Sequence, residues 1–490
     1  MTVAPRAGRA APFATRAAAL LGAGGLLLAA CTSTTAGHGV ARPPSSRSTS
    51  TSPSSPPSSG PSARRPDDCS TYAQPDPDRP RMSLNFRIAA DHRTVHGAER
   101  ILFRADRPVT ELIFRLTANT KPTVEEGNKI VVTAASADHG AGRYRFSAAN
   151  ADPSTQGGLL HIPFGSTIPV GTAVTASVDF DLTLGRETFD RFGRSGAFAY
   201  FGSAQPLLAW ERGYGWHTED MLDFTAESAT SEAMQVDLTV TAPARDVVIA
   251  SGDPADPPTG ATTRTWHSTI DAARDVSVAA GPFAVSDSHV NGVRVRVGAP
   301  NPAIRDALVP EFRRAILELA GFFGPFPFPS LSVARLPTQG GGIEYPSSIL
   351  MLDGSRLVAV HETAHQWFYA MVGDSQALHP WLDEAFAEYA EQLVDDDQPH
   401  DGALHAPGTV DASTESYGAD QNAYYFTTYN KGAAALHAAR EAAGRAKWDA
   451  ALKCYVAANA WRIANPKDLR AAIAKLPAGI AVLRSAGALT

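Results

Sequence analysis

The sequence predicts an all-β N-terminal domain followed by an α+β domain, behind a leader and a linker that do not fold. Short runs of alternating apolar and polar residues fill the chain from about residue 82 to 281, helix-period runs appear only after residue 290, and Ser, Thr and Pro dominate residues 32–68. A chain of 490 residues with 44% hydrophobic residues is long enough for two or three domains, each with its own core. The formal net charge is −7 and no long basic stripe occurs, which excludes nucleic acid as an expected partner.

The first 31 residues are predicted to be a lipoprotein signal peptide. Arg6, Arg9 and Arg16 precede the apolar run AAALLGAGGLLLAA, which is too short to span a bilayer as a stable helix. The segment LAAC that ends at Cys31 resembles a bacterial lipobox, which implies cleavage before Cys31 and acylation of its sulfur. A plain secretory signal with an incidental cysteine is the alternative. We therefore expect an exported protein, lipid-anchored through Cys31 to the outer face of the bacterial cytoplasmic membrane.

Residues 32–68 are predicted to form a disordered linker, because they offer almost nothing apolar to bury. Two cysteines follow it, Cys69 at the start of the folded region and Cys454 near its end. An exported protein can keep a disulfide, and two thiols allow one pairing. A bridge between them and two free thiols are equally compatible with the sequence.

Residues 69–290 are predicted to form the β domain. The expected strands are LNFRIAA, TELIFRL, KIVVTAA, TAVTASVDFDLTL, MQVDLTVTAP and DVVIASG, and clusters of Gly, Asp, Pro and Asn separate them. No long run with a helical period interrupts these strands, and no repeat of fixed length is visible.

Residues 291–490 are predicted to form the α+β domain. It opens with the strand VRVRVGAP and the helix PAIRDALVPEFRRAILELAGFFG, which ends at a glycine. The strands LSVARLP and SSILML flank the segment TQGGGIEYP. Helices are then expected near residues 358–372, 381–394 and 432–443.

Two histidines and a glutamate stand on one predicted helix, in the run VAVHETAHQW at residues 358–367. Residues four apart lie on one helix face about one turn from each other, so His361 and His365 can bind one ion. Glu362 is rotated about 100° from His361, which places its carboxylate near the ion without making it a ligand. Imidazoles suit zinc, whose catalytic sites use three protein ligands and keep a position for water. Two surface histidines are the alternative interpretation of this motif taken alone.

A third ligand is predicted at Glu384. Eighteen residues separate it from His365, and it lies in a second predicted helix, WLDEAFAEYAEQL, after the loop GDSQALHP. His361, His365 and Glu384 form the donor set of a hydrolytic zinc site, so one Zn²⁺ per chain is expected. Metal-binding histidines need acceptors for their second nitrogen, and Glu388, one turn beyond Glu384, is a candidate.

This arrangement of His361, His365 and Glu384, with the third ligand in a W-L-x-E segment, resembles the signature of the gluzincin aminopeptidases, the family of aminopeptidase N. The segments GGIEY (341–345) and YNKG (429–432) are similar to two further motifs of that family. The resemblance covers nearly everything from about residue 80 to 460. It implies a saddle-like N-terminal β sandwich and a thermolysin-like zinc metallopeptidase domain, in a short bacterial lipoprotein form that lacks the family's C-terminal helical domain.

The same resemblance implies roles for individual residues. Glu344 would match the glutamate that binds the free α-amine of the substrate, with Gly341 and Gly342 beside it. Tyr429 would match the tyrosine that stabilises the oxyanion. Gln205, in FGSAQPLLAWERG, would match a glutamine that lines the substrate site, and an ordinary polar loop residue is the alternative.

Together these residues predict a zinc-dependent metallopeptidase. Glu362 would act as general base on the attacking water, and the substrates would be peptides with a free N-terminus, as for an aminopeptidase. Tyr345 and Ala385 stand where the family usually has asparagine and glycine. Two alternatives stay open: a zinc endopeptidase whose cleft is open because no helical domain caps it, and a catalytically lapsed binding module tethered to the membrane.

Overall fold

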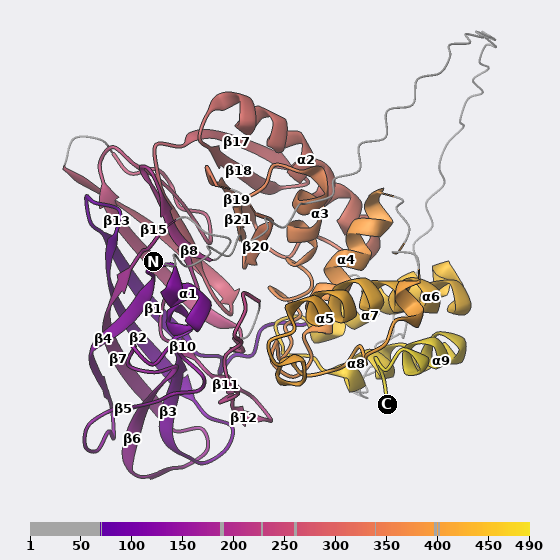
Figure 1. The fold of residues 1–490 in the computed structure, drawn as a ribbon, viewed down its shortest axis with the longest axis horizontal. Coiled ribbons are helices and arrows are strands. Elements are labelled where there is room, and N and C mark those ends of the chain that lie inside the picture. Colours follow the sequence, from indigo (N-terminus) through magenta and orange to yellow (C-terminus); the bar gives the residue numbers. More distant parts are fainter. Residues whose placement is uncertain are drawn as a thin grey trace, which may run out of the picture. The chain divides into compact units, whose positions relative to one another are not determined.

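The computed structural model describes residues 69, 71–186, 191–226, 229–258, 262–338, 340–395, 399 and 402–490 (Figure 1). The expected signal peptide at residues 1–31, which includes Cys31, and the expected linker at residues 32–68 lie outside the described residues. Across the described part of the chain, every helix is too short or too polar to cross a lipid bilayer.

The largest sheet is built from six strands of the N-terminal half. They are β1 (Arg81–Ile88), β2 (Thr94–Arg104), β4 (Lys129–Ala137), β7 (Ala173–Thr183), β13 (Met234–Pro243) and β15 (Thr263–Ala273). The strand order is β15-β13-β1-β2-β7-β4, with β1 and β13 parallel and the other pairs antiparallel. In β1 every second side chain, from Met82 to Ile88, is buried, so the alternation seen in the sequence sets the inner face of the sheet.

Two smaller sheets and one short ladder complete this half. The first pairs β10 (Leu207–Leu208), β3 (Val109–Arg115), β6 (Leu159–Ile168) and β5 (Arg145–Ser147) in that order. The second pairs β14 (Val247–Ala250), β16 (Ser277–Gly281), β9 (Phe198–Gly202) and β8 (Phe192–Ser195), and β11 (Trp210–Glu211) pairs with β12 (Gly215–Trp216). The helical turns η1 (Thr117–Asn119) and α1 (Lys121–Glu125) are short. One continuous apolar core joins these sheets, which confirms the predicted β domain.

A five-stranded sheet begins the second half. Its strands lie in the order β17 (Ala284–Val290), β18 (Val293–Ala299), β19 (Ser330–Arg335), β21 (Ser348–Met351) and β20 (Gly342–Tyr345). The sequence predicts a domain boundary between residues 290 and 291. In the structure β17 pairs with β18 in a hairpin, so the sheet of the second half already begins at Ala284. A period-two pattern does not tell which sheet a strand joins.

The other regular elements described in this half are helices and helical turns. They are α2 (Pro302–Phe323), α3 (Arg356–Ala364), α4 (Trp381–Asp395), α5 (Gln421–Tyr425), α6 (Gly432–Ala443), α7 (Arg445–Asn459), α8 (Pro466–Ala472) and α9 (Pro477–Ser485), with the shorter turns η2 (Ala403–His405), η3 (Thr414–Tyr417) and η4 (Phe426–Lys431), the last of which is a π-helical turn. Figure 1 shows α5 to α9, in orange and yellow, gathered together. The predicted order of an all-β domain and then an α+β domain is confirmed.

One helix is shorter than the sequence predicts. The apolar run at residues 358–372 predicts a single helix, but α3 ends at Ala364, and His365 caps it. Beyond this point Trp367 and Phe368 are fully buried in the helical core, and Tyr369 has φ 102°, outside the helical region. Packing of the two aromatic rings therefore outweighs the local helix pattern.

Cys69 and Cys454 form a disulfide, which answers the question that the sequence left open. The bond joins the start of the described chain to α7. Beside it, the Ala73 amide donates to the Ala457 carbonyl oxygen at 2.8 Å, and the Tyr72 hydroxyl donates to the carbonyl of Pro325. Residue 69 and residues 71–80, called the strap below, are thus fastened to the helical half before the chain enters β1.

Candidate active site

The two histidines project from the end of α3. Ser355 begins this helix, because its Oγ accepts a hydrogen bond from the Val358 amide at 3.2 Å and so satisfies one amide of the first turn. His361 lies in the last turn of α3, and His365 caps the helix one turn further on. Their rings are in contact, with centroids 4.9 Å apart. The four-residue spacing brings both imidazoles to one side of the helix.

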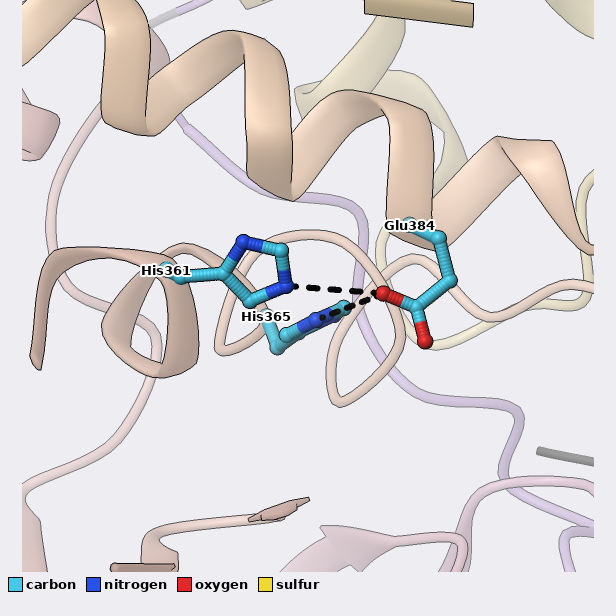
Figure 2. A group of neighbouring side chains, drawn as sticks. All are labelled: His361, His365 and Glu384. Carbon is cyan, nitrogen blue, oxygen red and sulfur yellow. Dashed lines mark ion pairs between the residues drawn. The ribbon is translucent and has the colours of Figure 1, made fainter. Parts of the chain in front are cut away.

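The α4 helix brings a carboxylate to the same point. Figure 2 shows both rings facing one oxygen of Glu384, whose Oε2 lies 3.5 Å from His361 Nε2 and 3.4 Å from His365 Nε2. Ligand atoms about 2.1 Å from a zinc ion at tetrahedral angles are about 3.4 Å apart. The donor atoms are therefore spaced as one divalent ion requires, and these three residues fit a metal.

The charges around these donors keep Glu384 ionised. It lies in the first turn of α4, where the helix dipole stabilises negative charge. Burial acts to raise the pKa of Glu384, but the imidazoles of His365 and His361 lower it more, so the pKa ends below its ordinary value. Burial acts to lower the pKa of His361, but hydrogen bonds to Glu384 and Glu391 raise it well above its ordinary value. A bound metal ion would therefore displace a proton from His361.

Two more carboxylates of α4 face the other nitrogen of His361. Its Nδ1 lies 3.4 Å from Glu391 Oε2 and 3.8 Å from Glu388 Oε2. Glu391 was not predicted from the sequence, although its distance from Glu384 and Glu388 follows the i, i+4, i+7 spacing of one helix face, which could have identified it. The second nitrogen of His365, Nδ1, lies 3.2 Å from the Phe368 carbonyl oxygen. These contacts fix the orientation of both rings.

Glu362 lies beside the donors, against the edge strand β20. It is 5% exposed and packs on the backbone of Gly342, so closely that a Cβ on that glycine would come within 2.4 Å of Glu362 Cγ. A side chain at position 342 would therefore occupy the space of the Glu362 carboxylate. Glycine at position 342, in the segment GGIEY, is therefore needed for this packing.

Tyr429 belongs to η4, the π-helical turn between α5 and α6. Its ring is nearly parallel to that of His361, with an interplanar angle of 7° and centroids 6.1 Å apart. Burial and the neighbouring Glu384 carboxylate raise the pKa of the Tyr429 phenol well above its ordinary value, so the hydroxyl keeps its proton. Tyr429 can therefore act as a hydrogen-bond donor to negative charge that develops nearby.

A single pocket of about 380 Å³ contains most of the residues predicted from the sequence. It is lined by His361, His365, Glu384, Glu362, Tyr429, Gly341, Gly342 and Glu344. Glu344 lies on β20 and is 4% exposed. Arg191, Thr225 and Tyr425 also line the pocket, but no motif marks them in the sequence. The structure thus brings the metal group, the predicted general base and the predicted amine-binding residue into one space.

Gln205 is the one predicted site residue of the folded part that lies elsewhere. It is fully buried, and its side-chain amide donates to Asp275 Oδ1 at 2.9 Å. Asp275 also accepts hydrogen bonds from the Ser203 hydroxyl and from the Val276 amide. Gln205 does not occur among the described residues that line the pocket. Its contacts are those of a polar residue that satisfies a buried carboxylate.

Comparison with known proteins finds a family match in the C-terminal part of the chain. Residues 347–484 match the model of the peptidase family M1 domain. Aminopeptidase M1-A of Oryza sativa subsp. japonica is 23% identical over 236 residues, which are 40% of this chain and 27% of that protein. Aminopeptidase M1 of Arabidopsis thaliana is 23% identical over 186 residues, which are 31% and 21%. The matched part therefore spans only about a quarter of the length of these curated relatives.

Solved structures match a much larger part of the fold. The M1 zinc metallopeptidase of Deinococcus radiodurans superposes with a TM-score of 0.64 at 20% identity, and the match covers 85% of this chain and 94% of that chain. A mutant of the same enzyme bound to a Tyr-Ser-Ala substrate has a TM-score of 0.64 at 19% identity, covering 84% and 94%. Both halves of the present chain therefore have the fold of these two-domain proteins.

Proposed function

We propose that the chain is a zinc-dependent metallopeptidase of peptidase family M1, because residues 347–484 match the model of that family's domain. The observation that carries the proposal is the group of His361 Nε2, His365 Nε2 and Glu384 Oε2 at separations of 3.4 and 3.5 Å. Glu362 and Tyr429 line the same pocket, so a proton carrier and a hydrogen-bond donor accompany the metal group. A lapsed binding module has no chemical need for this complete set.

When bound, zinc would lower the pKa of a water molecule to about 7 and polarise the carbonyl of the scissile bond. The residues of the chain do the rest. The Glu362 carboxylate takes a proton from the attacking water and delivers it to the leaving amine. The Tyr429 hydroxyl donates a hydrogen bond to the carbonyl oxygen as negative charge develops on it. Because the pocket walls already hold these groups in place, little reorganisation accompanies the reaction.

We further propose that the substrates are peptides with a free N-terminus, so that the enzyme is an aminopeptidase. Glu344 lines the pocket from β20 and is almost fully buried. Its carboxylate can form a charge-assisted hydrogen bond with an ammonium group of the substrate. The edge of β20 supports this orientation, because its backbone can pair with an extended peptide.

The test compares a fluorogenic amide of a free amino acid with its N-acetylated form, each with and without a zinc chelator. We expect turnover of the free amine only, loss of activity with the chelator, and recovery when zinc is restored. Equal turnover of both substrates would favour the endopeptidase alternative. No turnover of either substrate by protein that holds zinc would contradict the proposed chemistry altogether.

We also propose that the protein is exported and held at the membrane through an acylated Cys31. The lipobox-like segment supports this, and so does the disulfide between Cys69 and Cys454, because such bonds persist mainly outside the reducing cytosol. Labelled fatty acid should enter the wild-type protein and not Cys31→Ser, which should be released from the membrane fraction. Wild-type protein without label would contradict the anchor.

A further inference from the structure

The pocket continues into a small polar space in the β half. Arg191, Thr225 and Ala226 line the active-site pocket and also a second, smaller cavity of about 20 Å³. Thr117, Thr120 and Thr123 line the far part of that cavity, which we call the alcove. Its volume is about that of one or two water molecules, so it admits the head of a small polar group and excludes a ring.

Arg191 gives the alcove its charge. It immediately precedes β8 and is 5% exposed. Among the described residues that line the active-site pocket, it is the one lysine or arginine, whereas Glu344, Glu362, Glu384 and Glu391 contribute carboxylates. These acids belong to β20, α3 and α4, while Arg191 and the threonines belong to the β half. Arg191 is therefore the one guanidinium or ammonium side chain of this described lining, on the side of the pocket that opens into the alcove, and its charge also acts on the buried Asp275 carboxylate.

Three threonines, Thr117, Thr120 and Thr123, line the alcove together with the Arg191 side chain and supply hydroxyl groups. The Thr120 hydroxyl donates to Thr123 Oγ1 at 2.7 Å. Thr117 is 6% exposed, and its Oγ1 has no hydrogen-bond partner among the described residues. A buried hydroxyl without a partner costs free energy unless a ligand or water satisfies it. Thr117 is thus a second sign, independent of Arg191, that the alcove receives a polar group.

The wall of the alcove is fixed to the catalytic half. The Tyr425 hydroxyl donates to the Thr225 carbonyl oxygen at 2.9 Å, and the Phe224 and Tyr424 rings are 5.4 Å apart. Tyr424 and Tyr425 belong to α5, which leads directly into the η4 turn that carries Tyr429. Phe224 and Thr225, which line the alcove together with Arg191, are therefore held against the catalytic half by contacts that do not depend on substrate.

We propose that Arg191 and the threonine hydroxyls of the alcove bind a carboxylate of the substrate, so that the enzyme prefers acidic peptides over their amide counterparts. A guanidinium and a carboxylate match in charge and in fork geometry, and hydroxyl donors complete the shell of the anion. This inference rests on the proposed peptidase function. The carboxylate has two sources in a peptide: the side chain of an N-terminal Glu or Asp, and the C-terminal carboxylate of a very short peptide.

Two pairs of substrates distinguish these two sources. Each is assayed with the purified full chain after it has been loaded with zinc. The first pair is the fluorogenic amides of glutamate and glutamine, with the alanine amide as a neutral reference. The second pair is trialanine with a free and with an amidated C-terminus. We expect kcat/KM to favour the acid over the amide by at least about ten-fold in one of the pairs. The measured quantity is this ratio within each protein, so a general loss of activity in a variant cancels.

Four variants test whether the alcove causes the preference, measured as the ratio of kcat/KM for the acid to that for the amide. Arg191→Gln should abolish the preference, and Arg191→Lys should keep part of it, because an ammonium retains the charge but loses the fork. Thr117→Val, which keeps the shape of the side chain, should reduce it and serves also if Arg191→Gln does not fold. Arg194→Gln is the matched control, because Arg194 lies on β8, the strand that follows Arg191, but is not among the described residues that line the pocket. It should leave the ratio unchanged.

The outcomes separate the inference from the proposed function. Cleavage of the alanine amide with equal rates for acid and amide in both pairs would overturn the inference and leave the peptidase function intact. A preference that persists in both Arg191→Gln and Thr117→Val would also overturn it. Absence of turnover on every substrate would overturn the proposed function, and the inference with it.

Discussion

Glu362 and Glu384 lie in one pocket, and their surroundings give them different chemical roles. Glu384 faces two imidazoles at 3.4 and 3.5 Å and belongs to the group of donors that lie within 4.8 Å of one another. Glu362 stands outside that group and packs on the backbone of β20. These positions match the roles that we propose, with the first carboxylate as a metal ligand and the second as a proton carrier.

Replacement of Glu362 by glutamine tests this division. The amide keeps the size of the side chain but does not accept the proton of the attacking water, so kcat should fall by a factor of about 10² to 10⁴. Zinc content, measured by metal analysis of the purified variant, should stay at one ion per chain. Turnover close to that of the wild type would refute the role of Glu362 as general base.

Glu99 is a buried carboxylate far from this chemistry. It lies on β2 between Leu84 of β1 and Val178 of β7, and neither of its oxygens has a hydrogen-bond partner among the described residues. Burial raises the pKa of Glu99 well above its ordinary value. The folded protein therefore holds this group protonated in the range where the unfolded chain, with a pKa of about 4.3, ionises it.

The free energy of unfolding should accordingly fall as the pH rises from the unfolded pKa of Glu99 toward its raised folded pKa, because unfolding releases a proton there. Glu99→Met removes the ionisable group and keeps the length of the side chain. It should flatten this part of the pH dependence and raise the free energy of unfolding near pH 8 by about 1–3 kcal/mol. Urea denaturation of both proteins near pH 5 and pH 8 measures the effect. A variant less stable than the wild type near pH 8 would contradict it.

At the scale of elements, the active site depends on how closely β20 approaches α3. β20 is the edge strand next to β21, and Gly342 lets its backbone lie directly against Glu362. Gly342→Ala should therefore displace the Glu362 carboxylate and lower kcat by at least about ten-fold, while zinc binding through α3 and α4 persists. Steady-state kinetics together with metal analysis test this expectation.

Gly354→Ala is the matched control for that variant. Gly354 lies in the loop just before α3, and a Cβ there would meet no atom within 4 Å. Its kcat should equal that of the wild type. If Gly342→Ala and Gly354→Ala both had the kcat of the wild type, the close contact between β20 and Glu362 would not matter for catalysis.

At the scale of the whole molecule, the strap ties the beginning of the folded chain to its C-terminal helices. The disulfide between Cys69 and Cys454 spans 385 residues of sequence, and the Trp367 indole donates to the Tyr72 hydroxyl at 3.2 Å. A cross-link over so long a loop removes much conformational entropy from the unfolded chain. The strap should therefore contribute to the stability of both halves together.

Replacement of both cysteines by serine should lower the free energy of unfolding by about 2–5 kcal/mol. Thermal unfolding of the variant and of the wild type, each with and without a reducing agent, measures this loss. The reduced wild type should unfold at the temperature of the variant, and the reducing agent should leave the variant unchanged. Equal melting temperatures for the oxidised wild type and the variant would contradict a stabilising role.

The sequence by itself determined the order of the two folds and most of the metal group. Periods of two and of 3.6 residues are local properties, so β1 and α6 follow from their own residues. The four-residue spacing of His361 and His365 is local too, since it lies within one helix. Glu384 follows from its spacing after His365, and the resemblance to the aminopeptidase N family implies Glu344 and Tyr429. The pocket contains all three.

Only the tertiary structure decided the features that join residues distant in sequence. The early end of α3 reflects packing of Trp367 and Phe368 in the helical core, and β17 joined the second sheet because it pairs with β18. The Gln205 side chain donates a hydrogen bond to the buried Asp275 carboxylate and does not line the described pocket. Arg191 carries no motif, and it lines the pocket together with Thr225, whose carbonyl oxygen accepts a hydrogen bond from Tyr425 of α5. Contacts between distant segments are set by which surfaces pack together, and no local pattern encodes that choice.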